Sequence, residues 1–173
     1  SLLHDMGKVH EAHEQYKKAL NMNLKTVGTR HPETASTYNS LGTLYEDIGD
    51  DAHAQEHFSK CLEIQLHTVG ESSPDVANTY NNLATILFRR GSRDEAADLL
   101  RKAVGVLDAA GVPKGNPDRA VYEENLEEVM THPVEKQAAE NDIPIPEELE
   151  AEMMADAEQD HGMYDTPMQK LAF

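Results

Sequence analysis

The sequence predicts an all-α fold in which pairs of helices stack into a solenoid, followed by an acidic extension. Three observations lead to this prediction. The stretch His31–Asp50 recurs 42 residues later as Ser73–Ser92, and a fixed period between 20 and 50 residues is typical of repeat architectures. Apolar residues within each unit recur at intervals of three and four, which is the spacing of one helix face. Glycines recur at the same period, at places where a helix would end.

The repeat predicts six helices, at residues 8–27, 33–48, 51–69, 75–90, 93–110 and 117–130. Pro32 and Pro74 suit the first turn of a helix, where no amide donor is needed. Gly49 and Gly91 are expected to end helices, because glycine adopts the left-handed conformation at little cost. Gly7 stands one period before Gly49, so residues 1–7 are expected to be the last turns of a separate helix.

The second helix of each pair is predicted to pack against the first through small and apolar residues. Alanines at 54 and 96 would let the two helices approach closely, but a single pair cannot bury its apolar faces alone, so neighbouring pairs must stack. In residues 51–69 the expected inner face consists of Ala54, Phe58, Cys61, Leu62, Gln65 and Leu66.

The order of these residues, an aromatic, then Leu-Gly or Leu-Ala, then glycine, alanine and a further apolar residue, resembles the tetratricopeptide repeat. The period of 42, the sequence Tyr-Asn-Asn-Leu-Ala at 80–84 and the long connection at 67–77 resemble its kinesin-light-chain subclass. The resemblance covers residues 1–130. It implies a right-handed α-solenoid with a partial repeat, two full repeats and a degenerate last repeat that starts at Pro117.

Residues 131–173 are expected to form a separate acidic extension. They carry 11 acidic residues against two lysines. A short helix at 134–140, an acidic helix near 146–160 and a terminal strip at 163–173 are predicted. Two interpretations stay open: a solvated extension that caps the solenoid, or a segment that docks on a partner or on the solenoid itself.

The charge and the apolar pattern exclude two classes of partner. The net charge of −17 argues against binding to nucleic acid, because phosphate affinity comes from lysine and arginine, and it permits basic partners. No apolar run approaches the ~18 residues of a membrane helix, so no membrane insertion is expected. The single cysteine, Cys61, rules out an intramolecular disulfide and fits a reducing compartment such as the cytoplasm. An organellar or ciliary location stays open.

The candidate binding residues follow from the resemblance, which implies that the first helix of each pair lines a concave, peptide-binding side. An asparagine side chain offers both a donor and an acceptor, which matches a peptide bond. A solvated polar face is the alternative interpretation. The arginines here stand against Glu46 and Asp47, so a groove strongly selective for acidic peptides is not expected. The predicted binding residues are Asn39, Ser40, Thr43, Asn78, Asn81, Asn82, Thr85 and Arg89.

One stretch matches a zinc-protease pattern, His-x-x-Glu-His at 53–57. The repeat explains it more simply, since Ala54 and Phe58 hold packing positions and the histidines flank them. No third ligand is marked, so no metal, cofactor or catalytic residue is expected. His10 and His13 are interpreted as exposed helix residues.

The sequence therefore favours a non-catalytic scaffold or adaptor that binds a peptide or a protein surface. The alternative is a structural subunit of a large cytoskeletal, ciliary or organellar assembly, anchored by its C-terminal tail. A metal-dependent hydrolase is the third and least favoured hypothesis.

Overall fold

The computed structural model describes the backbone of residues 2–131 and the side chains of residues 8–131. These residues form six helices and no strand, which confirms the all-α repeat fold. The features predicted for 134–140, 146–160 and 163–173 lie outside the described residues. The helices are α1 (Leu2–Thr26), α2 (Pro32–Asp47), α3 (Asp51–Thr68), α4 (Pro74–Arg89), α5 (Arg93–Ala109) and α6 (Pro117–Thr131).

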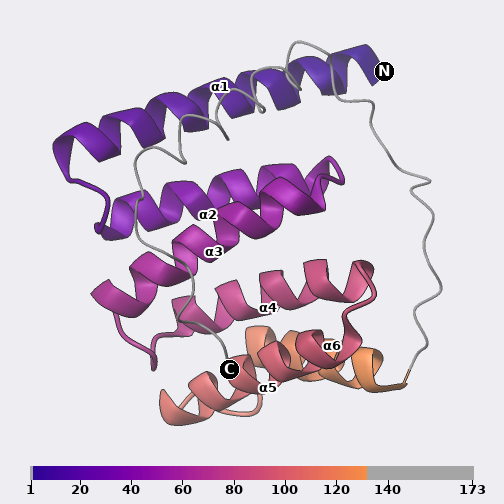
Figure 1. Cartoon of the computed structure of the whole chain (residues 1–173). Coiled ribbons are helices and arrows are strands. Elements are labelled where there is room, and N and C mark those ends of the chain that lie inside the picture. The colour runs from indigo at the N-terminus through magenta and orange to yellow at the C-terminus, as the bar shows by residue number, and fades with distance from the viewer. Residues whose placement is uncertain (1, 132–173) are drawn as a thin grey trace.

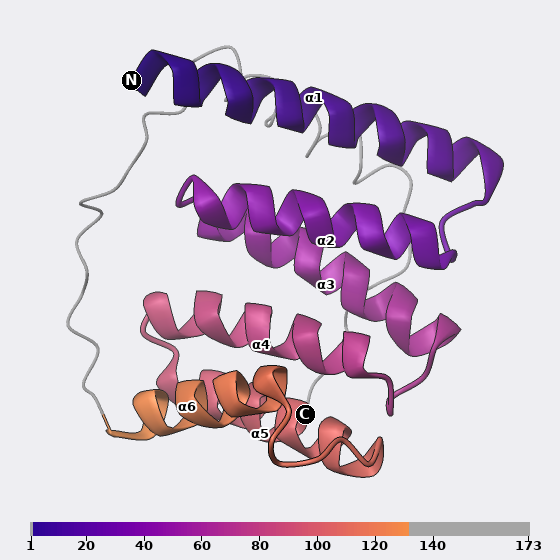
Figure 2. The ribbon, with the colours of Figure 1, turned by 180° about the vertical axis from the view of Figure 1, so that it is seen from behind.

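The helices stack in chain order. α2 packs most extensively on α3 and α4 on α5, so each forms a hairpin, and α1, α3 and α5 each pack on the first helix of the next unit. Figures 1 and 2 show α1 at one end of the stack and α6, with α5, at the other. Each helix contacts its neighbours in the sequence, as expected for a solenoid.

Apart from the start of α1, the predicted helix boundaries are confirmed to within a residue or two. Pro32 and Pro74 open α2 and α4, behind caps in which the side chains of His31 and Ser73 accept hydrogen bonds from the second residue of each helix. Gly49 and Gly91 have φ angles of 82° and 86°. A glycine adopts this conformation without strain, which lets the chain reverse between paired helices.

The break predicted at Gly7 is wrong, because α1 runs without interruption from Leu2 to Thr26. A glycine inside a helix costs only about 1 kcal/mol relative to alanine, which does not by itself end the helix. Asp50 follows Gly49 and caps the next helix by accepting a hydrogen bond from the His53 amide. Lys8 follows Gly7 and cannot accept such a bond, so no new helix starts there.

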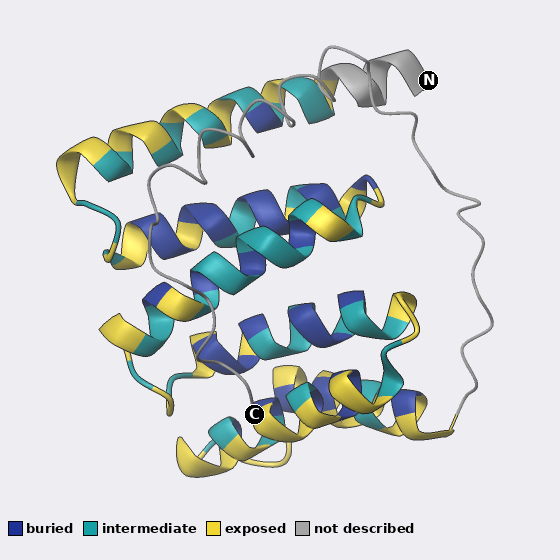
Figure 3. Ribbon diagram, in the orientation of Figure 1, coloured by how far each residue is buried: buried dark blue, intermediate teal, exposed yellow. Residues whose placement is uncertain are grey.

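The core lies between the stacked helices (Figure 3). Ala54, Phe58 and Cys61 are fully buried, as the repeat predicts. The inner face of α3 continues through Ile64 and not through Leu66, which is partly exposed. Ile64 lies three residues beyond Cys61, so it keeps the helical spacing of the buried stripe.

A repeated pair of polar side chains joins consecutive units. The Asn23 amide donates to the hydroxyl of Thr37 at 3.1 Å, across α1 and α2. One period later, the Thr79 hydroxyl donates to Gln65 Oε1 at 2.8 Å, across α3 and α4. Both threonines are buried, and each hydroxyl also donates to the carbonyl four residues earlier, in Glu33 or Asp75, so the buried hydroxyls are fully used. These bonds explain why threonine recurs at 37 and 79.

The outer face of α1 stays open within the described residues. Tyr16 is 36% exposed, whereas Phe58 and Leu100, which hold the same position one and two periods later, are 0% and 1% exposed. Met22, at the position of buried Ile64, is 63% exposed. Among the described residues, no helix covers in α1 the face that α3 and α5 bury against their paired helices.

The expectation that His13 is exposed is wrong. Its side chain is 2% exposed and its Nε2 lies 2.9 Å from the Tyr45 hydroxyl. His13 is in fact one of the residues by which α1 packs on α2. An imidazole can fill such a position because its apolar ring packs while one nitrogen meets a polar partner.

Candidate functional site

The predicted binding residues occupy one side of α2 and α4, and their hydroxyl groups are used locally. Ser40 donates to the Ser36 carbonyl, and Thr43 to the Asn39 carbonyl. Thr85 donates to the Asn81 carbonyl in the same way. These bonds within one helix satisfy the hydroxyl protons, which leaves the asparagine amides as the groups best suited to contact a ligand.

The asparagines of α4 are bonded to α6. Asn125 donates to Asn81 Oδ1 at 2.8 Å, and Asn78 donates to the Tyr122 hydroxyl at 3.4 Å. Asn82 in turn donates to Asn78 Oδ1 at 3.4 Å. This step of the solenoid, between α4 and α6, is closed by side-chain amides from both helices.

The equivalent step between α2 and α4 is open. Asn39 holds the position of Asn81, one period earlier, yet its Oδ1 is buried and has no hydrogen-bond partner among the described residues. A buried acceptor without a donor costs about 1–3 kcal/mol. Because this oxygen is shielded from solvent, a donor from another molecule can reach it only if the Asn39 amide turns outward.

An open pocket of about 200 Å³ lies at this step. It brings together two of the predicted residues, Asn39 of α2 and Asn78 of α4. It also contains residues that the sequence interpretation did not single out, contributed by the last turn of α3 and the first turns of α2 and α4. Its lining consists of Pro32, Ala35, Ser36, Asn39, Gln65, Thr68, Val69, Asp75 and Asn78.

The remaining lining residues carried a weak sequence signal. Pro32 and Asp75 are in the first turns of helices that begin at repeat-spaced prolines, so their end of the groove could be predicted. The contribution of Thr68 and Val69 could not, because it depends on where α3 stops relative to α4.

Arg89, the predicted cation of the groove, is held by two carboxylates. It donates to Asp51 Oδ1 at 2.6 Å and to Glu46 Oε1 at 3.2 Å, so it ties α4 to both helices of the preceding pair. Burial raises the pKa of Glu46, and Arg89 offsets part of that rise. The guanidinium is therefore already paired and offers little to an acidic ligand.

The histidines of the zinc-protease pattern have structural partners. The Asp50 carboxylate accepts from His53 Nδ1 at 2.7 Å, and His57 Nδ1 donates to the His53 carbonyl at 2.9 Å. Tyr45 stacks on His53. Burial lowers the pKa of His57 to about 4, while the bond to Asp50 raises the pKa of His53. Across residues 8–131 no three His, Cys, Asp or Glu side chains are grouped to hold a metal ion.

Cys61 is buried and its sulfur lies 3.7 Å from the Thr79 hydroxyl. Burial raises the pKa of this thiol to about 11. A thiol of such pKa is almost wholly protonated near neutral pH and reacts slowly as a nucleophile. Cys61 does not line the pocket. The side chains of Asn39, Asn78 and Asp75 do, and they can form hydrogen bonds and, through Asp75, an ion pair.

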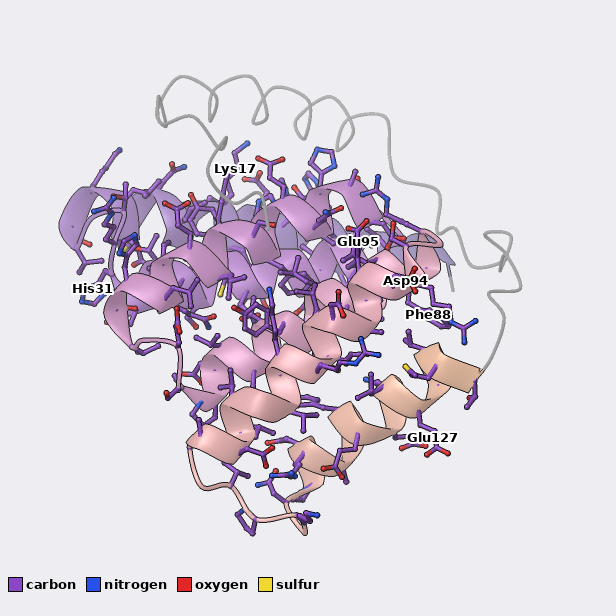
Figure 4. The ribbon with its side chains drawn as sticks, turned by 60° about the horizontal axis from the view of Figure 1, so that its bottom comes forward. Lys17, His31, Phe88, Asp94, Glu95 and Glu127 are labelled. Carbon is purple, nitrogen blue, oxygen red and sulfur yellow. The ribbon has the colours of Figure 1, made fainter. Side chains whose placement is uncertain are left out.

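The far end of the stack is acidic. Figure 4 shows Phe88 near the start of α5, where Asp94 and Glu95 lie. Phe88 also lies near the last turns of α6, from which Glu127 points outward. Phe88 packs on the buried cluster that contains Val129.

Within residues 2–131, none of the six helices has the length and apolar character needed to cross a bilayer.

Comparison with known proteins gives a family and a fold. The family model described as tetratricopeptide repeat matches residues 1–67 and 52–109. Two crystal structures described as kinesin light chain nearly identical TPR-like repeats, from Podosopora anserina, are 24% identical to the chain. They have a TM-score of 0.64 and cover 71% of this chain and 57% and 58% of their own. A comparison with curated proteins finds no match.

A third structure, BtubC (BKLC) from P. vanneervenii, is 20% identical, has a TM-score of 0.65 and covers 96% of this chain and 63% of its own. At these identities the likeness is one of fold. The chain spans less than two thirds of the length of each of these structures.

Proposed function

Because the chain belongs to the tetratricopeptide repeat family, as the match over residues 1–109 shows, we propose that it is a non-catalytic scaffold or adaptor. It holds a peptide or a protein surface at the step between α2 and α4. In this proposal residues 1–130 form the binding array and residues 131–173 an acidic extension. Repeats of this family mediate protein–protein contacts, and the fold alone does not select the partner.

The observation that carries the proposal is the contrast between the two steps of the solenoid. At the α4–α6 step the Asn81 and Asn125 amides bond to each other at 2.8 Å. At the α2–α4 step none of the described residues donates to Asn39 Oδ1, and a pocket lies beside it. In this proposal the Asn39 amide turns outward and accepts a peptide N–H, and the amide of Asn78 donates to a peptide carbonyl, since an asparagine side chain offers both a donor and an acceptor.

The test is a selection of peptides from a random dodecamer library with the full 173-residue chain, followed by calorimetric titration of the strongest ligands. The double substitution Asn39→Ala and Asn78→Ala is expected to weaken binding at least tenfold. Asn21→Ala, an exposed asparagine of α1, is the matched control and should bind as the parent does. Peptides bound equally well by the double variant would contradict the proposal.

The open face of α1 favours a second candidate, a structural subunit of a larger assembly. Tyr16 and Met22 are exposed at positions that are buried in α3, and apolar faces of this kind are covered in assemblies. Sedimentation velocity distinguishes the two candidates. A structural subunit would associate through this face, and Tyr16→Lys would abolish the association, whereas an adaptor stays monomeric and binds its peptide.

A further inference from the structure

The pocket at the α2–α4 step also indicates the charge of the residue it takes. We propose that it receives a lysine or arginine side chain of the bound peptide, with Asp75 as the counter-ion and Asn78 as a neutral acceptor. This inference rests on the proposed function, since it concerns the same site and names the chemistry of the residue that enters it.

Asp75 gives the pocket its charge. It is the second residue of α4 and the only charged residue among those that line the pocket. In the part of the chain that the structure describes, its carboxylate forms no ion pair with a lysine or an arginine; the acids that do so are Glu14, Glu46, Asp51, Glu56, Asp98, Asp108 and Glu123.

The neutral lining groups offer acceptors. Among the described residues, Asn78 Oδ1 accepts only the long 3.4 Å bond from Asn82. Asn39 Oδ1 has no donor there either, but it is shielded and becomes an acceptor for a ligand only if its amide turns outward. Gln65 Oε1 is different, because it already accepts from the Thr79 hydroxyl. A lysine ammonium has three donors and an arginine guanidinium has five, and neither has an acceptor. Such groups complement the carboxylate of Asp75 and the amide oxygen of Asn78.

An acidic side chain would fit poorly at the same place. It would lie beside Asp75, and like charges at short range repel. The cation predicted for the groove, Arg89, is already bonded to Glu46 and Asp51. The net charge of −17 adds a long-range attraction for basic partners. The carboxylate of Asp75 and the net charge of the chain therefore both favour a positively charged ligand.

The size of the pocket fits one side chain. Its volume of about 200 Å³ lies below the roughly 300–1,000 Å³ of sites that enclose a whole small molecule. Pro32, Ala35 and Val69 supply apolar surface, on which the methylene stem of a lysine or an arginine can pack while its charged end meets Asp75.

The experiment uses the same dodecamer library and the full chain. We expect lysine or arginine to be enriched at one position of the selected peptides. We expect Asp75→Asn to remove that enrichment while peptides are still selected. Asp94→Asn is the matched control, because Asp94 is likewise the second residue of its helix and does not line the pocket. It should leave the enrichment unchanged.

A thermodynamic cycle then tests the contact itself. In the strongest peptide the enriched residue is replaced by citrulline, which keeps the shape of arginine without its charge. The affinity should fall about tenfold for the parent and less than threefold for Asp75→Asn. Selected peptides without the enrichment, or with one that survives Asp75→Asn, would overturn this inference and leave the proposed function standing. A library that yields no peptide would overturn both.

Discussion

The ring of Phe58 fills the space that a side chain on Gly42 would occupy. A Cβ atom on Gly42 would lie 2.7 Å from both Cδ1 and Cε1 of the ring, well inside the 3.4 Å at which ordinary contact begins. In the next pair alanine stands at 84 and leucine at 100, both buried in one cluster. The larger residue of one helix thus faces the smaller residue of its partner in each pair.

Gly42→Ala is expected to lower the free energy of unfolding by about 1–3 kcal/mol, because the buried ring of Phe58 must move to admit the methyl group. Adding Phe58→Leu should recover much of this loss, since the double variant reproduces the combination of Ala84 and Leu100. Urea unfolding followed by circular dichroism measures both effects.

Gly105→Ala is the control, because Gly105 lies in α5 and a Cβ there would meet nothing within 4 Å. It should raise the stability by about 0.5–1 kcal/mol, the usual gain from replacing an unconstrained helix glycine. A Gly42→Ala variant that gains stability as Gly105→Ala does would show that α2 and α3 are not so closely packed.

Acid should destabilise the protein partly through His57. Its folded pKa of about 4 lies below the unfolded value of about 6.5, so the unfolded state binds the proton more tightly. The penalty is absent above pH 6.5, grows as the pH falls from 6.5 to 4, and reaches about 3 kcal/mol below that. His57→Gln should remove this part of the pH dependence. The measurement is urea unfolding of both proteins at pH 7 and pH 5.

Titration of His53 changes the stability with pH in the direction opposite to that of His57. Its pKa is raised by Asp50, so its contribution is complete below the unfolded pKa of about 6.5 and is lost as the pH rises through the folded value. His53→Gln should therefore lower stability more at pH 5 than at pH 8. Equal losses at the two pH values would mean that the bond to Asp50 does not involve the charged imidazolium.

Removing Arg89 should loosen the contact of α4 with the preceding helix pair. Arg89→Gln is expected to cost about 1 kcal/mol at low ionic strength and less in 1 M salt, because the pair is only partly screened from water. The pKa of Glu46, which burial already raises, should rise further and can be followed by carboxyl carbon NMR. Arg101→Gln, whose ion pair with Asp98 is more exposed, should change stability less.

Cys61 reports whether α3 and α4 separate. With a pKa of about 11 against the ordinary 9.0, its thiolate fraction at pH 8 is about 100-fold below that of a free cysteine. Iodoacetamide should therefore modify the folded chain at least 100-fold more slowly than the chain in guanidinium. Comparable rates in the two states would show that this contact opens readily.

The repeat made most of the fold predictable. Prolines at 32 and 74 and glycines at 49 and 91 act within their own turns, so their effect can be derived from local conformational preferences. Gly7 misled the prediction because periodicity alone does not show whether the next residue can cap a helix. His13 was misplaced because its partner, Tyr45, lies on another helix.

The candidate site was less predictable than the fold. The repeat indicates that Asn39 and Asn81 share a position, and the structure places both on the same side of consecutive first helices. Whether each amide is paired depends on the next helix: Asn125 meets Asn81, and no counterpart meets Asn39. The sequence set Arg89 against Glu46 and Asp47, whereas the packing of α4 on α2 and α3 shows that its two partners are Glu46 and Asp51.

The exposed face of α1 has a consequence for how the array opens. In a stacked solenoid each helix is stabilised by its own folding and by its nearest neighbours. α1 has a neighbour on one side in the described residues and leaves Tyr16 in solvent, whereas α3 and α4 are covered on both sides. Local opening therefore needs less free energy in α1 than in the central helices, and we expect its amide hydrogens to exchange before theirs. The pocket at the α2–α4 step lies in the part of the chain that opens last.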